Sequence, residues 1–311
     1  MQSRAWRPWG VPPPSPHRAP WRRVASHMVP RAGDHIAPHL RLVRPLGKGG
    51  MGSVWVVHHA TLETDVAVKF IAYELGELDE HMMARFKREA ALSAKLKSPH
   101  VVKTFDHGTM PNGRPYIVME LLEGETLGER LAREGRLSSH DVALVVGQVA
   151  QVLSEAHSLA VVHRDIKPDN VFLLSSAYEL FVKVLDFGIA KQTSMPNLVT
   201  VTDTGAIIGT PEYMSPEQLL STNSADYRAD MWALAVLAYH ALTGQPPFSG
   251  ETLPALSLKI CGGRFTPPSK IDALLPYGLD GWFEKAFAPT PADRFNNVAT
   301  LADSFRRLIA G

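Results

Sequence analysis

Two patterns of hydrophobic residues divide the chain into a strand-rich and a helix-rich part. Short β-branched runs predict strands over 40–42, 54–57, 66–71, 101–105 and 116–121. After a polar connector at 120–124 the spacing becomes helical, and one stripe is predicted to be buried: Val142, Val145, Val146, Val149, Val152, Leu153 and Ala156. Ser138, followed by Asp141, marks the start of this helix. The boundary between the two parts is expected near Leu122.

One helix interrupts the strand-rich part. The pattern predicts it from Leu78 to Lys97, ending before a Ser-Pro pair. Its inward face carries Glu89, and a carboxylate that points inward needs a partner. Lys69, on the strand before this helix, is the expected partner. Taken alone, without Lys69, Glu89 would be interpreted as an exposed residue, because its neighbours include several Lys and Arg residues.

The first 38 residues differ from the rest in composition. Residues 1–38 contain eight Pro, six Arg and a single Asp, and they show no hydrophobic periodicity. This composition predicts a disordered Pro/Arg-rich tail. The tail carries +5 and the whole chain +1, so residues 39–311 carry −4. A mildly acidic folded part argues against nucleic acid as a partner, since that requires a broad basic face.

Length and composition indicate an ordinary globular protein. The 311 residues are 45% hydrophobic, which is enough to bury a sizeable core in two lobes. The single cysteine, Cys261, cannot form an intramolecular disulfide, and this favours a reducing compartment. Every apolar run is far shorter than the roughly 20 residues of a spanning helix. We therefore expect a cytoplasmic protein without a membrane segment.

The candidate chemistry is concentrated between Val161 and Gly188. Asp165 and Asn170 lie five residues apart on an expected loop, because Pro168 resists helix continuation. Two short apolar strands, 171–174 and 181–185, then form a hairpin that folds Asp186 back towards Asn170. Two oxygen ligands of different charge suit Mg²⁺, which completes its shell with water and substrate phosphates. The stretch therefore predicts a phosphoryl-transfer site.

A glycine-rich loop, Gly-Lys-Gly-Gly-Met-Gly-Ser, occupies positions 47–53. This G-x-G-x-x-G spacing is a weak signal by itself. In a dinucleotide-binding domain it would open a helix and be followed by an acidic residue, whereas here a β-branched strand follows and the next strand carries Lys69. A hairpin with such a turn can place backbone N–H groups over phosphates.

Five motifs together occur in the order and spacing of the protein-kinase signature set. They are Gly47–Val54, Val66–Lys69, His163–Asn170, Asp186–Gly188 and Ser215–Glu217. From about Leu40 to Leu308 the chain resembles the eukaryotic-like serine/threonine protein kinases of bacteria. The resemblance implies an α+β bilobal fold over 39–311. A small antiparallel-sheet N-lobe with one regulatory helix would span 39–122, and a larger, mainly helical C-lobe 123–311.

The resemblance also implies a role for each catalytic position. Asp165 would be the catalytic base and Lys167 would neutralise the γ-phosphate. Lys69 would hold the α- and β-phosphates and be held in turn by Glu89. Asn170 and Asp186 would bind Mg²⁺, with Mn²⁺ as a possible substitute. The expected ATP-binding residues are Leu46, Gly47, Lys48, Gly49, Gly50, Gly52, Val54, Ala67, Lys69, Met119, Glu120, Leu122 and Phe172.

Within this pocket, the resemblance places adenine between a roof and a floor. Leu46, Val54 and Ala67 would form the roof and Phe172 the floor. Met119 would lie at the back of the pocket, and Glu120 and Leu122 would offer backbone hydrogen bonds. Plain core packing is the alternative interpretation of the apolar members.

The same resemblance addresses acceptor and regulation. A lysine two residues after the catalytic Asp goes with serine/threonine kinases, and Thr210 would bridge Asp165 and Lys167. A phosphate on Thr202 or Thr204 would pair with Arg164 and with Lys191, which implies autophosphorylation in trans through a transient dimer. Exposed loop hydroxyls without a role are the alternative. The expected partners are protein substrates with Ser or Thr acceptors.

Two further functions remain open from sequence alone, a pseudokinase scaffold and a small-molecule kinase. The filled positions Lys69, Asp165 and Asp186 count against the first, and the segment from Thr210 to Glu217 against the second. Two structural roles are also expected. Asp230 would brace the backbone at His163-Arg164, and Arg294 would pair with Glu217.

Overall fold

The computed structural model describes residues 30–49, 52–71, 95–110, 113–175, 179–186, 200–201, 207–208, 211–220 and 226–311. The strands are β1 His35–Ala37, β2 Leu40–Gly49, β3 Gly52–His59, β4 Thr64–Ile71, β5 Thr104–Thr109, β6 Pro115–Met119, β7 Gly124–Thr126, β8 Val171–Leu174, β9 Phe181–Val184, β10 Thr200–Val201 and β11 Ile207–Ile208. The α-helices are α2 Leu127–Glu134, α3 Ser139–Ser158, α4 Pro216–Leu220, α5 Arg228–Thr243, α6 Leu253–Cys261, α7 Leu279–Ala286 and α8 Val298–Ala310. Short 3-10 helices span Pro168–Asn170, Pro211–Tyr213, Pro268–Lys270 and Pro291–Asp293.

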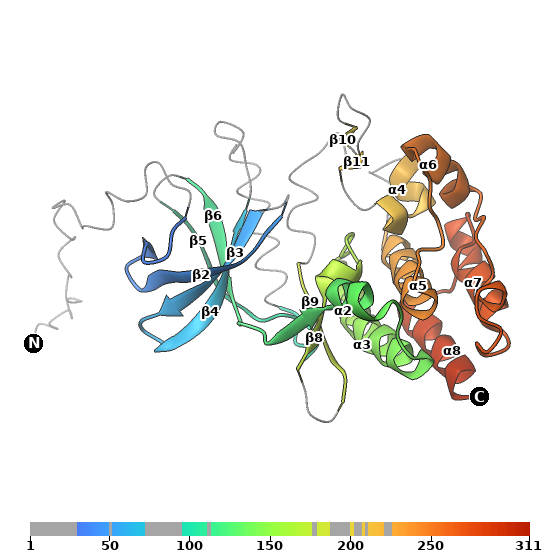
Figure 1. The fold of residues 1–311 in the computed structure, drawn as a ribbon, viewed down its shortest axis with the longest axis horizontal. Coiled ribbons are helices and arrows are strands. Elements are labelled where there is room, and N and C mark those ends of the chain that lie inside the picture. Colours follow the sequence, from blue (N-terminus) through green and yellow to red (C-terminus); the bar gives the residue numbers. More distant parts are fainter. Residues whose placement is uncertain are drawn as a thin grey trace, which may run out of the picture.

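An antiparallel sheet and a group of helices form the two halves of the molecule, as the hydrophobic pattern predicts. Figure 1 shows strands β2 to β6 on the left and helices α3 to α8 on the right, with β8 and β9 between them. The six-stranded sheet has the order β1-β2-β3-β4-β6-β5. A second sheet, β7-β8-β9, has three strands.

The two faces of the six-stranded sheet carry different sets of residues. Directly opposed residues of antiparallel strands share a face, and alternate residues of one strand point to opposite faces. One face buries a separate apolar cluster that includes Trp55, Val57, Val68, Phe70 and Tyr116. The other face includes Lys69, which contacts Asp186 after β9. It carries Val54, Ala67, Lys69 and Met119, because Val54 pairs with Lys69 and Ala67 with Met119.

The ordered fold begins before residue 39, which corrects the predicted extent of the tail. Strand β1 pairs antiparallel with β2 through His35 and Arg41. Ile36 is buried in the apolar cluster of the sheet. The composition of 1–38 hides this strand because it is only three residues long and follows a run of Pro and Arg. Residues 1–29 lie outside the described part of the chain, so the rest of the tail prediction is untested.

The helical half is built around α5, which is buried along almost its whole length. The ring of Trp232 stacks on Phe248 at a centroid distance of 5.4 Å. Helix α3 begins as predicted, since the Ser138 hydroxyl accepts a hydrogen bond from the Asp141 backbone N–H at 3.1 Å. The predicted valine stripe of α3 is buried against the same core. The predicted helix over 78–97 lies outside the described residues up to position 94.

Gly124 opens β7, the strand that follows the connector between the two halves. Its φ is +145°, and a Cβ atom there would lie 2.0 Å from the carbonyl oxygen of Leu173 and 3.0 Å from the ring of Phe172. Only glycine allows β7 to approach β8 so closely. We expect Gly124→Ala to lower the free energy of unfolding by about 1–3 kcal/mol, measured by urea denaturation.

A matched control for this substitution is Gly147→Ala. Gly147 lies within α3, and a Cβ atom there would meet nothing within 4 Å. Because alanine is the better helix former, this variant should gain about 0.5–1 kcal/mol. Equal effects of the two substitutions would contradict the close approach at Gly124.

Candidate active site

The loop before β8 holds a carboxylate in a fixed place. The side-chain amide of Asn170 donates to the backbone oxygen of Asp165 at 2.7 Å and to its Oδ2 at 3.0 Å. The ammonium of Lys167 lies 3.5 Å from the same Oδ2. Asp165 and Asn170 are both buried. The five-residue spacing read from the sequence thus becomes one hydrogen-bonded unit, closed by the 3-10 helix Pro168–Asn170.

A second carboxylate lies beside this loop, as the predicted hairpin requires. Strands β8 and β9 pair antiparallel, and the backbone N–H of Leu185 donates to the carbonyl oxygen of Asn170 at 2.9 Å. This bond brings Asp186 next to Asn170. Lys69 lies on β4 of the six-stranded sheet, and its Nζ is 2.5 Å from Asp186 Oδ2. Two lysines and two carboxylates therefore converge between the halves of the molecule.

Two residues of this site have left-handed backbone conformations. The φ angles of Arg164 and Asp186 are +64° and +52°. A residue other than glycine pays a local cost for this conformation, and such residues are concentrated at functional sites. Surrounding contacts must therefore hold both residues in place.

Asp230, on α5, supplies these contacts for Arg164 and confirms its expected role. Its carboxylate is fully buried. It accepts from the backbone N–H groups of His163 at 2.9 Å and Arg164 at 2.7 Å. It also contacts Nε2 of His157 at 2.8 Å. Sequence reasoning missed His157, which lies on α3 and carries no motif signal apart from its position shortly before the loop.

The apolar residues expected around adenine lie on strands of both sheets, except Leu122, which lies on the connector after β6. Val54, Ala67 and Met119 share the face of the large sheet that carries Lys69, as the strand register requires. Phe172 lies on β8, where it pairs with Thr126 of β7. Leu46, on β2, is 45% exposed. The role of these positions in adenine binding stays a prediction.

The connector after β6 offers polar backbone groups, and one of them is already used. The backbone N–H of Glu120 donates to the carbonyl oxygen of Lys103 at 2.9 Å. Glu120 can therefore offer only its carbonyl oxygen to a ligand. Its carboxylate pairs with Lys183 at 2.7 Å, an interaction that sequence reasoning missed. The only sequence signal for Lys183 is a lone lysine between two valines of an otherwise apolar strand.

The glycine-rich turn is partly described. Gly47 and Lys48 pair across the hairpin with Val54 and Ser53, and Gly49 pairs with Gly52. Six predicted site residues lie outside the described parts of the chain: Gly50, Glu89, Lys191, Thr202, Thr204 and Thr210. Their roles stay predictions.

The segment before α4 is anchored to the helical core. The Tyr213 hydroxyl and Nδ1 of His240 lie 2.6 Å apart. Burial raises the pKa of Tyr213, and burial lowers the pKa of His240. Both shifts favour neutral partners, with the phenol donating to the imidazole.

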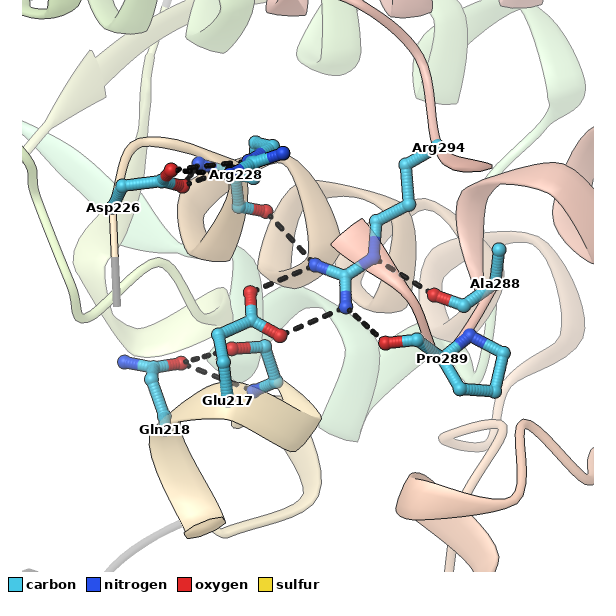
Figure 2. Close-up of polar contacts among 8 residues, drawn as sticks. Glu217, Gln218, Asp226, Arg228, Ala288, Pro289 and Arg294 are labelled. Carbon is cyan, nitrogen blue, oxygen red and sulfur yellow. Dashed lines mark hydrogen bonds and ion pairs between the residues drawn. The ribbon is translucent and has the colours of Figure 1, made fainter. Parts of the chain in front are cut away.

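Arg294 holds α4 to the helices behind it, as expected from the sequence. Figure 2 shows its guanidinium between the Glu217 carboxylate and the backbone carbonyls of Ala288 and Pro289. Both oxygens of Glu217 accept hydrogen bonds of 2.8 Å. Arg294 is buried and Glu217 is largely so, with side-chain exposures of 1% and 12%. Bidentate geometry of this kind is among the strongest that side chains form.

A family model described as the protein kinase domain matches residues 40–266. The chain belongs to the protein kinase family. Its fold is the kinase fold, with an antiparallel-sheet N-lobe and a helical C-lobe. It matches a crystal structure of the Mycobacterium tuberculosis PknI kinase domain with a TM-score of 0.72 and 28% identity, over 91% of this chain and 100% of that one.

Curated relatives are bacterial serine/threonine protein kinases. The chain is 39% identical to Pkn1 of Myxococcus xanthus over 273 residues, which is 87% of this chain and 38% of the relative. It is 35% identical to PknH of Mycobacterium tuberculosis over 272 residues, which is 88% of this chain and 42% of the relative. The kinase chain thus spans less than half the length of either relative. Among the helices that the structure describes, none combines the length and apolar character needed to cross a membrane.

Proposed function

We propose that this chain transfers the γ-phosphate of ATP to serine or threonine hydroxyls of proteins. One observation carries the proposal: Asp165, fixed by Asn170 and Lys167, lies beside a second carboxylate, Asp186, that is paired with Lys69. A base, phosphate-binding cations and oxygen ligands are the parts that phosphoryl transfer requires, since positioning and electrostatics supply most of the rate.

Three side chains of the active site have distinct roles in the proposed reaction. Asp165 accepts the proton of the acceptor hydroxyl, whose oxygen forms a bond to the γ-phosphorus as the bond to the β-phosphate oxygen breaks. ADP and a phosphorylated side chain are the products. Lys167 stabilises charge on the transferred group, and Lys69 binds the phosphates that stay with ADP.

The donor set fits a magnesium ion. The amide nitrogen of Asn170 donates to Asp165, and its amide oxygen would serve as a ligand. The Asp186 carboxylate supplies a second oxygen, and Mg²⁺ is bound through one or two protein oxygens plus substrate phosphates. When bound, the ion would neutralise phosphate charge. Substitution by Mn²⁺ is part of this proposal.

Acceptor choice and regulation are part of the proposal as well. The acceptor class rests on Lys167 and on the relatives, which are named serine/threonine kinases. We further propose that Thr202 or Thr204 is phosphorylated in trans and then pairs with Arg164 and Lys191. A cytoplasmic location is proposed from the single cysteine.

The direct test incubates the purified chain with labelled ATP, Mg²⁺ and a generic protein substrate. We expect label on serine and threonine of the substrate, and only background label with Asp186→Ala. ATP binding without transfer would instead indicate a pseudokinase scaffold. Transfer to a small molecule but not to protein would indicate a small-molecule kinase.

A further inference from the structure

A partly buried ion pair lies behind the proposed nucleotide site. Lys183 Nζ and Glu120 Oε1 are 2.7 Å apart, with side-chain exposures of 8% and 22%. Glu120 belongs to the connector after β6, and Lys183 to the middle of β9. Neither side chain has a place in the phosphoryl-transfer chemistry proposed above.

The strand segment around Val101 completes the arrangement. Lys183 Nζ also donates to the carbonyl oxygen of Val101 at 3.2 Å. The Lys103 backbone N–H donates to the same oxygen of Glu120 that binds Lys183, at 2.7 Å. The pair thus joins three separate segments of the chain at one carboxylate oxygen.

Strand β9 extends this connection to the metal-binding carboxylate. Backbone bonds fix the strand against the segment beside it, from Val184 N–H to the carbonyl of His100 at 2.7 Å and from Val102 N–H to the carbonyl of Val184 at 3.1 Å. Asp186 follows Lys183 by three residues on this strand and its continuation. A displacement of β9 relative to the connector would therefore move Asp186 relative to the adenine-binding backbone.

Stability alone does not account for the pair. Breaking a buried ion pair is costly, but replacing both partners by uncharged groups of similar volume is often neutral or stabilising. A fixed distance between the two ends of the nucleotide site is a function that only a directional contact supplies.

We propose that Lys183 is a positioning residue which, through Glu120, couples adenine binding at the connector to metal binding at Asp186. This inference rests on the proposed function, because it assigns the adenine to Glu120 and the metal to Asp186. Coupling between two such ligands is reciprocal, so each binds more tightly when the other is present.

The test measures how much Mg²⁺ improves ATP binding. The dissociation constant of ATP is determined by calorimetry with EDTA and with Mg²⁺, and the ratio of the two values is compared between proteins. We expect Lys183→Met to lower this ratio by about fivefold or more, which is the lower range of measured coupling. Lys183→Arg, which keeps the charge, should retain most of the ratio.

Two further variants separate positioning from stability. The double variant Glu120→Gln/Lys183→Met leaves no unpaired buried charge, so its melting temperature should return close to that of the wild type while the ratio stays low. Lys103→Met is the matched control. The side chain of Lys103 is exposed, and only its backbone joins the arrangement, so this variant should keep the wild-type ratio.

Two results would overturn the inference alone. One is an unchanged ratio in Lys183→Met, with both dissociation constants shifted by the same factor. The other is recovery of the ratio together with the melting temperature in the double variant. Failure of the proposed function is distinguishable, because the wild type itself would then show neither phosphoryl transfer nor a gain in ATP affinity with Mg²⁺.

Discussion

Asp165→Asn is expected to lower kcat by about 10²–10⁴-fold, the usual contribution of a positioned general base. The carboxylate of Asp165 is held by Asn170 and Lys167 rather than by a nucleotide contact. An asparagine of the same shape should preserve the loop and the affinity for ATP while losing the ability to accept a proton. The expected signature is therefore a large fall in kcat with little change in the dissociation constant of ATP.

The same variant tests the proposed regulation. Tandem mass spectrometry of the purified proteins should find phosphate on Thr202 or Thr204 of the wild type and none on Asp165→Asn. Adding active wild type to the Asp165→Asn protein should restore the modification if it occurs in trans. Asp303→Asn is the control, since it removes only a surface ion pair on α8. A variant with wild-type kcat would exclude Asp165 as the base, and an unmodified wild type would exclude autophosphorylation at these threonines.

Arg294→Met is expected to lower the free energy of unfolding by about 3–5 kcal/mol, because it leaves the largely buried Glu217 carboxylate without its cation. Arg294 donates to Glu217 and to three backbone carbonyls, including that of Arg228. Its guanidinium also lies 4.8 Å from the ring centre of Trp232. Chemical denaturation measures the loss.

Arg228→Met is the control for this experiment. Arg228 and Asp226 form another Arg–carboxylate pair at 2.8 Å (Figure 2), but their side chains are 33% and 41% exposed. A pair in that environment contributes about 0–1 kcal/mol, so Arg228→Met should be nearly neutral. Similar losses for the two variants would show that burial is not what makes the Arg294 pair important.

The Arg294–Glu217 pair should also make the free energy of unfolding depend on pH in the acidic range. Burial alone would raise the pKa of Glu217, but the hydrogen bonds and charge of Arg294 outweigh it and hold the pKa below the ordinary value of 4.5. The contribution of the pair is therefore present above pH 4.5 and lost as the pH falls through the lowered pKa. The stability difference between wild type and Arg294→Met should shrink over that range.

Sequence alone placed the residues of the loop before β8 and the hairpin after it, because these arrangements are local. Five residues separate Asp165 from Asn170, and a short turn returns Asp186 to the same place. Strand register then determines which side chains share a face with Lys69. The partners in the Arg294–Glu217 pair, and those in the contact of Asp230 with His163 and Arg164, lie far apart in the sequence. Only the family resemblance predicted these contacts.

The Lys183–Glu120 pair could not be predicted in the same way. A lysine within an apolar strand is expected to point to solvent. Nothing in the local sequence indicates that it pairs with a carboxylate 63 residues earlier. Glu120 was assigned a role for its backbone only. Contacts between side chains of distant strands depend on how the strands pack, which periodicity does not specify.

Strand β1 has a consequence for where the chain can be shortened. A cut at the boundary read from the sequence, before residue 39, would remove Ile36 from the apolar cluster of the sheet. It would also strip the outer hydrogen-bonding groups of β2 near Arg41 of their partner. A bare sheet edge next to newly exposed apolar surface is a template for intermolecular pairing. Three residues that carry no chemistry thus belong to the folded domain, and a shortened chain should keep them.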